Sequence, residues 1–111
     1  MVNSPTLDRT FSALSDPTRR AMLERISLGP ATVSELATLA RISLPGTLKH
    51  VRILEEADLV TSKKEGRTRE CRRGPAQLED ATAWIERYRS QWERRLDRLE
   101  AVIDKRKGGS R

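Results

Sequence analysis

The sequence has few of the residue types from which metal, disulfide and catalytic sites are built. It holds one cysteine and one histidine in 111 residues, Cys71 and His50. One subunit therefore cannot form an internal disulfide or a zinc site, which usually takes four ligands with Cys or His among them. No nucleophile, carboxylate pair or glycine-rich phosphate loop accompanies His50 as a general base. We predict a protein without metal or cofactor that is not an enzyme.

Long apolar runs are absent too. None approaches the ~20 residues of a membrane-spanning helix, and no signal-peptide pattern opens the chain. We expect a soluble, cytoplasmic protein with no membrane partner. Aromatic residues make up only 4% of the chain, so the core must come mostly from Leu, Ile, Val and Ala. The length suits a single domain, 1–111, and the net charge of +6 suits a polyanionic partner.

What is present is a pair of short helices joined by a tight turn within residues 31–60. Thr32 can cap the first helix, and the Glu35 side chain can accept a hydrogen bond from the Thr32 backbone amide, which together form a capping box. The turn falls at residues 41–42. Ser43 then stands where a second helix needs its N-cap. This arrangement predicts a helix-turn-helix.

The second helix of the pair has two distinct faces. Its spacing on a helical wheel predicts a core side formed by Thr47, Val51 and Leu54. The side predicted to face solvent or DNA carries Pro45, Lys49 and Arg52. Leu48 and His50 flank the buried side. An amphipathic helix with a basic outer face suits a reader of the major groove.

Two more helices are predicted before this pair. The first, residues 6–15, has three apolar residues on one side: Leu7, Phe11 and Leu14. Asp16 and Pro17 begin the second, because Asp is a good N-cap and Pro fits the first helical position. For Arg19 and Arg20 in its first turn, two interpretations stand equally: a solvated face, or contacts to phosphate or to a group within the protein.

A basic hairpin is predicted after the pair. Residues 59–62 and 68–73 have strand character, with a turn at 63–67. A hairpin directly after a recognition helix is a wing, whose tip would lie along DNA phosphates or in a minor groove. The cations expected to do so are Lys63, Lys64 and Arg67. The alternative is an edge hairpin whose charges only prevent aggregation. We interpret Cys71 as a packing residue, the alternative being a redox sensor.

The last helix is predicted over residues 77–107, followed by a disordered tail, 108–111. Apolar residues recur along it about every 3.6 positions. Those predicted to form a dimer interface are Ile85, Tyr88, Trp92, Leu96, Leu99 and Ile103. A helix of roughly 30 residues spans about 45 Å, more than so small a body can cover. A second copy of the chain would supply the partner helix, with the apolar side of helix 6–15 joining the interface.

Six stretches of the sequence form a recognisable set. They are 11–20 (FSALSDPTRR), 33–37 (VSELA), 42–45 (ISLP), 49–50 (KH), 54–60 (LEEADLV) and 65–67 (EGR). In these stretches the chain resembles the ArsR family of bacterial winged-helix repressors, over about residues 7–103. The resemblance implies a homodimer, joined through its first and last helices, that binds an operator and usually blocks transcription.

The resemblance also implies a set of DNA contacts. Carried over to this sequence, they are Ser43, Leu44, Pro45, Lys49 and His50, with Arg52 toward the backbone. Leu48 stands where a polar, base-reading serine is common, and we expect it to pack on the core rather than touch a thymine methyl. For His50 we favour a DNA contact over a purely packed position. The Cys and His positions at which many members sense metal have no counterpart here.

These observations predict a mainly α fold with a small β-hairpin: a winged helix-turn-helix over residues 16–75, dimerised through its first and last helices. The predicted function is a sequence-specific regulator of transcription that binds double-stranded DNA, a repressor acting as a homodimer on an inverted-repeat operator. Lys49 and His50 would read bases. The alternative is a winged-helix adaptor whose basic face docks an acidic protein. A small-molecule effector near Trp84, Tyr88 and Trp92 would supplement DNA binding.

Overall fold

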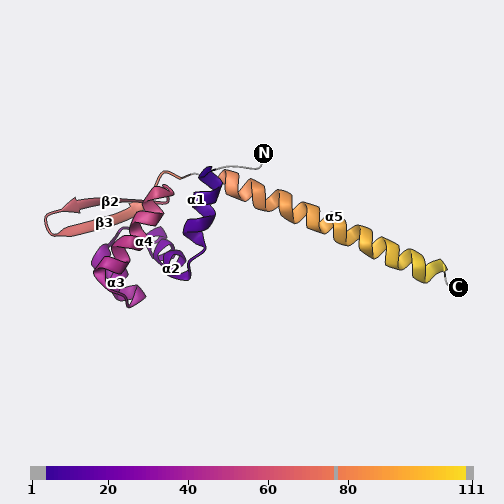
Figure 1. Ribbon diagram of the computed structural model, residues 1–111, viewed down its shortest axis with the longest axis horizontal. Coiled ribbons are helices and arrows are strands. Elements are labelled where there is room, and N and C mark those ends of the chain that lie inside the picture. The colour runs from indigo at the N-terminus through magenta and orange to yellow at the C-terminus, as the bar shows by residue number, and fades with distance from the viewer. Residues whose placement is uncertain (1–4, 77, 110–111) are drawn as a thin grey trace. The chain divides into compact units, whose positions relative to one another are not determined.

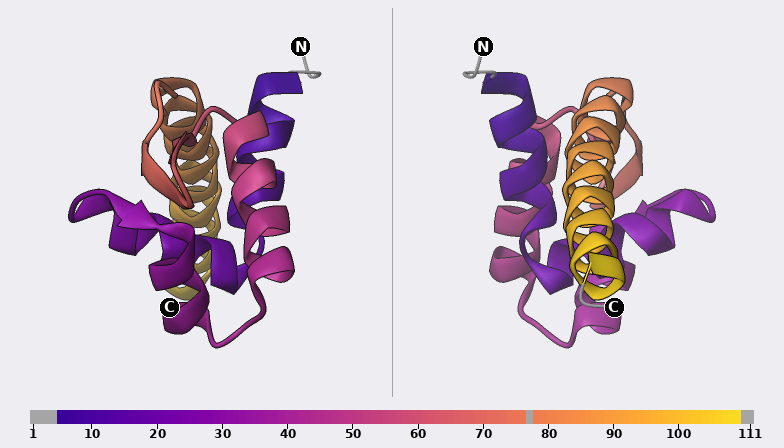
Figure 2. Two further views of the ribbon diagram at one scale, coloured as in Figure 1. Left: turned by 90° about the vertical axis from the view of Figure 1, so that its left-hand side faces the viewer. Right: turned by 90° about the vertical axis from the view of Figure 1, so that its right-hand side faces the viewer.

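The computed structural model describes residues 5–76 and 78–109 (Figures 1 and 2). These residues form a winged-helix body of four helices and three strands, and one long C-terminal helix. In chain order the elements are α1 (Pro5–Leu14), α2 (Pro17–Ser27), β1 (Ala31–Thr32), α3 (Val33–Ala40), α4 (Leu44–Glu56), β2 (Val60–Glu65), β3 (Thr68–Arg73) and α5 (Glu79–Gly109). The chain divides into two compact units, residues 1–77 and 78–111. The single domain expected from the length stays a prediction.

The core of the first unit lies among its helices and the base of its sheet. It is almost entirely aliphatic, as the scarcity of aromatic residues predicts. The largest fully buried side chains are Met22, Leu36, Thr47, Val51, Leu54, Val60 and Cys71. They come from α2, α3, α4, β2 and β3, so each element of this unit except α1 and the short β1 contributes at least one. The three residues predicted for the core side of α4 are confirmed.

The helix starts follow the capping residues in the sequence. The Asp16 carboxylate accepts hydrogen bonds from the backbone N–H groups of Thr18 and Arg19 at 2.7 and 3.3 Å, which begins α2. At α3 the Thr32 hydroxyl accepts from the Glu35 N–H at 3.1 Å. The reciprocal half of the predicted capping box is wrong, because the Glu35 carboxylate is bound by Arg25 at 3.1 Å instead.

The turn between α3 and α4 is tight and left-handed at one residue. Arg41 has φ 58° and ψ 41°, and its N–H bonds back to carbonyl groups in the last turn of α3. Ser43 then caps α4, its hydroxyl accepting from the Gly46 N–H at 3.1 Å. Pro45 lies in the first turn of α4, where no N–H is needed. The predicted helix-turn-helix is confirmed.

The sheet has three antiparallel strands in the order β1-β3-β2. The first of these, in which Ala31 pairs with Cys71, was not predicted because two residues are too few for a recognisable pattern. The predicted turn at 63–67 was too long. Residues 63–65 belong to β2, and Gly66, with φ 62°, forms the turn together with Arg67.

The second unit is α5, a helix of 31 residues. It begins at Glu79, two residues after the predicted start, and continues through Gly109. The tail predicted over 108–111 is therefore corrected at 108 and 109, while 110 and 111 lie outside the described residues. No helix in the described ranges is both long and apolar enough to cross a membrane.

Candidate nucleic-acid interface

The outer face of α4 carries the residues predicted to contact DNA. Ser43, Pro45, Lys49 and Arg52 are all exposed, and Leu44 is half exposed. On the opposite side Thr47 is fully buried, and its hydroxyl donates to the Ser43 carbonyl at 2.9 Å. This bond satisfies the polar group and explains how a threonine occupies a core position. The α4 helix therefore keeps its basic face free while its other face is fixed.

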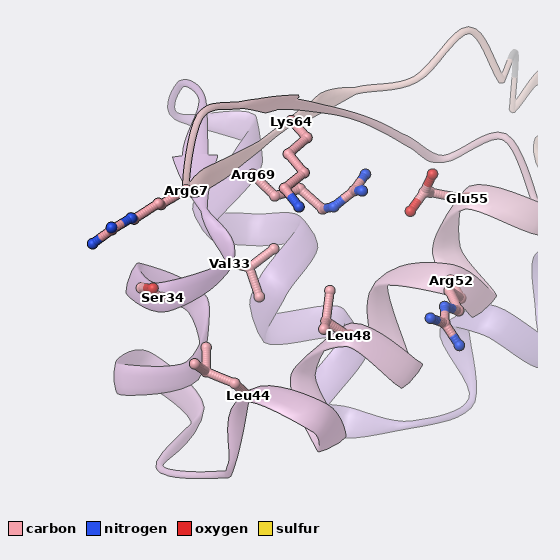
Figure 3. A pocket seen from close by; sticks show the side chains of 9 residues that line it. All are labelled: Val33, Ser34, Leu44, Leu48, Arg52, Glu55, Lys64, Arg67 and Arg69. Atoms are coloured by element: carbon pink, nitrogen blue, oxygen red, sulfur yellow. The ribbon is translucent and has the colours of Figure 1, made fainter.

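Leu48 is partly buried and packs against the hydrophobic core. This position supports the expectation that Leu48 serves packing. It also lines a concavity of about 480 Å³ between α3, α4 and the β2–β3 hairpin (Figure 3). The floor of the concavity is thus apolar, formed by Val33, Leu44 and Leu48.

The wall of the concavity on the hairpin side is cationic. Figure 3 shows Lys64 reaching from the hairpin toward Leu48 and Arg69 extending toward Glu55, whereas Arg67 points away from the concavity. Lys63, Lys64 and Arg67 are exposed, as expected for a wing tip. Lys63 lies 3.6 Å from the Glu65 carboxylate, but both side chains are largely in solvent, so this pair adds little stability.

Arg69 also belongs to this surface, although it was not among the predicted DNA contacts. Its guanidinium donates to the Ser62 hydroxyl at 2.9 Å, and that hydroxyl donates to the Glu55 carboxylate at 3.2 Å. The chain of bonds joins β3 through β2 to the last turn of α4. The cross-strand register of β2 and β3, in which Lys64 faces Arg69, was the available signal.

His50 and Arg19 form a contact that the sequence did not predict. His50 is partly buried, and its Nδ1 lies 3.2 Å from a guanidinium nitrogen of Arg19. Arg19 is only 9% exposed, so of its two interpretations the contact within the protein is confirmed. Arg20 is exposed and donates to the Leu14 carbonyl at 2.7 Å.

Cys71 is fully buried on β3. Burial, with the nearby carboxylates of Glu55 and Glu70, raises the pKa of its thiol to about 11, against the opposing charge of Arg69. At neutral pH the thiol is protonated and enclosed, which is the opposite of what a redox sensor needs. This supports the packing interpretation. The described residues hold no cluster of three or more His, Cys, Asp or Glu side chains suited to a metal ion.

The residues predicted for dimerisation lie on α1 and α5. On α1, Leu7, Phe11 and Leu14 are partly buried, and Leu14 packs against the core of its own unit. On α5 the predicted stripe is open to solvent: Ile85, Tyr88, Trp92, Leu96, Leu99 and Ile103 are 47–58% exposed. Three aromatic rings follow one another along the helix. Trp84 stacks on Tyr88 at 5.3 Å, and Tyr88 meets Trp92 edge to face at 6.1 Å.

Comparison with known proteins gives consistent relatives. Residues 14–63 match the family model described as a helix-turn-helix domain. The chain is similar to the HTH-type transcriptional regulator Rv2034 of Mycobacterium tuberculosis, with 35% identity over 87% of this chain and 88% of that protein. It is similar also to the transcriptional repressor SdpR of Bacillus subtilis, with 29% identity over 71% of this chain and 88% of that protein.

Solved structures agree with the winged-helix geometry. A crystal structure of the ArsR family transcriptional regulator RHA00566 matches with 42% identity and a TM-score of 0.70, over 79% of this chain and 97% of that one. On these grounds the chain belongs to the ArsR family of winged helix-turn-helix transcriptional regulators.

Proposed function

We propose that this chain is a repressor that binds double-stranded DNA as a homodimer on an inverted-repeat operator. Each subunit would place the outer face of α4 in a major groove, with Lys49 and His50 reading base edges. The wing would hold the DNA backbone. A protein with this task acts in the cytoplasm, at the chromosome, and carries out no catalysis.

One observation carries the proposal: α4 and the hairpin line the same concavity with cationic residues, of which Arg67 lies at the rim and points outward. The cationic residues that line it are Arg52, Lys64, Arg67 and Arg69. They come from α4 and from both wing strands and their turn, with Glu55 as the one carboxylate in the lining. A phosphate backbone running between recognition helix and wing would meet these charges, and its deoxyribose rings would meet the apolar floor.

Repression, rather than activation, is supported by the printed name of the relative SdpR. The homodimer is supported by the uncovered apolar stripe on α5, which a second α5 would bury. A ligand near Trp84, Tyr88 and Trp92 stays a prediction. Nothing in the relatives favours an adaptor that docks proteins.

Selection of bound sequences from a random duplex pool tests the proposal. We expect an enriched inverted repeat whose half-sites lie whole helical turns apart, because the two α4 helices are related by the dimer two-fold. The selected duplex should bind at least ~10³-fold more tightly than random duplex at physiological salt. Recovery of no sequence, with equal binding to all duplexes, would refute specific recognition.

A further inference from the structure

Arg19 is a nearly buried arginine that joins three elements. Its Nε donates to the Ala13 carbonyl at 2.8 Å, and one terminal nitrogen donates to the Ser12 carbonyl at 3.0 Å. These carbonyls lie in the last turn of α1, beyond the reach of the regular helical hydrogen bonds. The Ser12 carbonyl also accepts from the backbone N–H and the hydroxyl of Ser15, at 3.2 and 2.6 Å. The other terminal nitrogen lies 3.2 Å from Nδ1 of His50 on α4 and 3.9 Å from the Asp16 carboxylate.

The chemistry of this contact fixes the protonation of the imidazole. A guanidinium has donors only and stays charged in proteins, so Nδ1 of His50 must act as the acceptor and carry no proton. In a neutral imidazole the proton then lies on Nε2. Arg19 therefore selects one tautomer of His50 and holds one edge of its ring.

The opposite nitrogen, Nε2, is not fully enclosed by the protein. Over the described part of the chain, no buried side-chain nitrogen or oxygen lacks a hydrogen-bond partner. The described partner of the His50 ring is Arg19, through Nδ1. Because Nε2 is outside this bond and is not among the buried unpartnered atoms, it must be accessible. His50 follows the exposed Lys49 directly on α4, at the flank of the outer face.

We propose that Arg19 is a positioning residue for DNA recognition: it holds His50 as the Nε2–H tautomer, so that α4 offers DNA a fixed hydrogen-bond donor. The inference rests on the proposed function. The matching group on DNA is an acceptor, either a base acceptor such as guanine N7 or O6, or thymine O4, or a phosphate oxygen. Arg19 itself touches no DNA. It acts through His50, and its bonds to α1 set where that side chain stands.

The tautomer can be measured directly, because His50 is the only histidine in the chain. Nitrogen-15 NMR of the free protein, at a pH where the imidazole is neutral, separates a protonated from an unprotonated ring nitrogen. We expect Nε2 fully protonated and Nδ1 unprotonated in the native chain, with the two signals drawn toward a tautomer average in Arg19→Lys. A tautomer average or a protonated Nδ1 in the native chain would overturn the proposal.

Two amide substitutions separate the two nitrogens in DNA binding. In His50→Asn the amide reaches only the place of Nδ1, so it can accept from Arg19 but offers DNA nothing. In His50→Gln the amide reaches the place of Nε2 and keeps a donor for DNA. We expect His50→Gln to bind the selected duplex about 3- to 10-fold more tightly than His50→Asn, the value of one hydrogen bond.

Equal affinities of the two variants, or the reverse order, would refute the donor role of His50. The same comparison on random duplex distinguishes the two acceptors. A difference kept on random duplex indicates a phosphate oxygen, and one confined to the selected duplex indicates a base. Failure of the proposed function is distinguishable, because the native chain would then prefer no duplex, while the NMR measurement still reports the tautomer.

Discussion

At the scale of single residues, the wing carries two cations directly opposite each other on neighbouring strands. Lys64 and Arg69 are cross-strand partners, and like charges in such positions repel. The bond from Arg69 to Ser62, which in turn binds Glu55, offsets part of this repulsion by bringing a carboxylate near. An anion in the concavity would offset the rest. The pair is therefore better suited to a phosphate contact than to stabilising the free hairpin.

We expect Lys64→Ala to weaken binding to selected and random duplex alike, because phosphates are common to both. The plot of log K against log salt should lose about 0.9 of its slope for the one contact removed. Titrations at several salt concentrations measure this. Lys105→Ala, which removes an exposed cation from α5, is the matched control and should leave the slope unchanged. An unchanged slope in Lys64→Ala would show that Lys64 makes no contact with a DNA phosphate.

The buried thiol of Cys71 gives a second prediction at this scale. With a pKa of about 11, the thiol is almost wholly protonated at pH 8, whereas an unfolded cysteine titrates near pH 8.5. Since the thiolate is the reactive form, alkylation at pH 8 should be much slower in the folded protein than in urea. Rapid alkylation of the native protein would contradict this position for Cys71.

At the scale of elements, the base of the wing is held by Gly74, which directly follows β3. A Cβ on Gly74 would lie 2.4 Å from the Asp58 carbonyl oxygen and 2.7 Å from the backbone nitrogen of Val60. The Gly74 N–H also donates to the Leu59 carbonyl at 2.9 Å. The end of β3 is thus pressed against the segment that joins α4 to β2, and backbone atoms on both sides leave no room for a side chain.

We expect Gly74→Ala to destabilise the fold by about 1–3 kcal/mol, because backbone must shift to admit the methyl group. Urea unfolding followed by circular dichroism measures the loss. Gly66→Asn is the control: the site has open space and a positive φ that asparagine tolerates, so the cost there should be smaller. A Gly74→Ala protein as stable as the native chain would show that the close approach is not maintained in solution.

Much of the element order could be predicted, for reasons that particular residues make clear. Asp16, Thr32 and Ser43 cap helices by hydrogen bonds to residues two or three positions along the chain. Interactions between such near neighbours can be predicted from residue type and spacing alone. The features that were missed depend on contacts between distant parts of the chain. The bond between Arg19 and His50 spans 31 positions, and the two-residue strand β1 exists only because β3 lies beside it.

At the scale of the whole molecule, α5 has an apolar stripe that the described chain leaves exposed. Of its large apolar residues, Leu96 and Leu99 are the most open, at 56% and 58%. An exposed apolar strip of this length is typical of an interaction surface. A second α5 would match it in length and chemistry, and this is the basis of the proposed dimer.

We expect Leu99→Glu to weaken the dimer by at least ~10-fold, since a charge would be buried in an apolar interface without a partner. Ala101→Glu introduces the same side chain on the other side of α5 and should leave the association unchanged. Sedimentation equilibrium of both proteins measures the effect. A Leu99→Glu protein that dimerises like the native chain would place the interface elsewhere.

If the apolar face of α5 is buried only when two chains pair, repression depends on the concentration of the protein in the cell. When most of the protein exists as single subunits, the amount of dimer varies with the square of the total, so halving synthesis cuts the dimer concentration to about a quarter. The melting temperature should also rise as the protein is concentrated, because pairing favours the folded form by mass action. The exposed stripe of α5 would thus let the cell adjust repression through protein level alone.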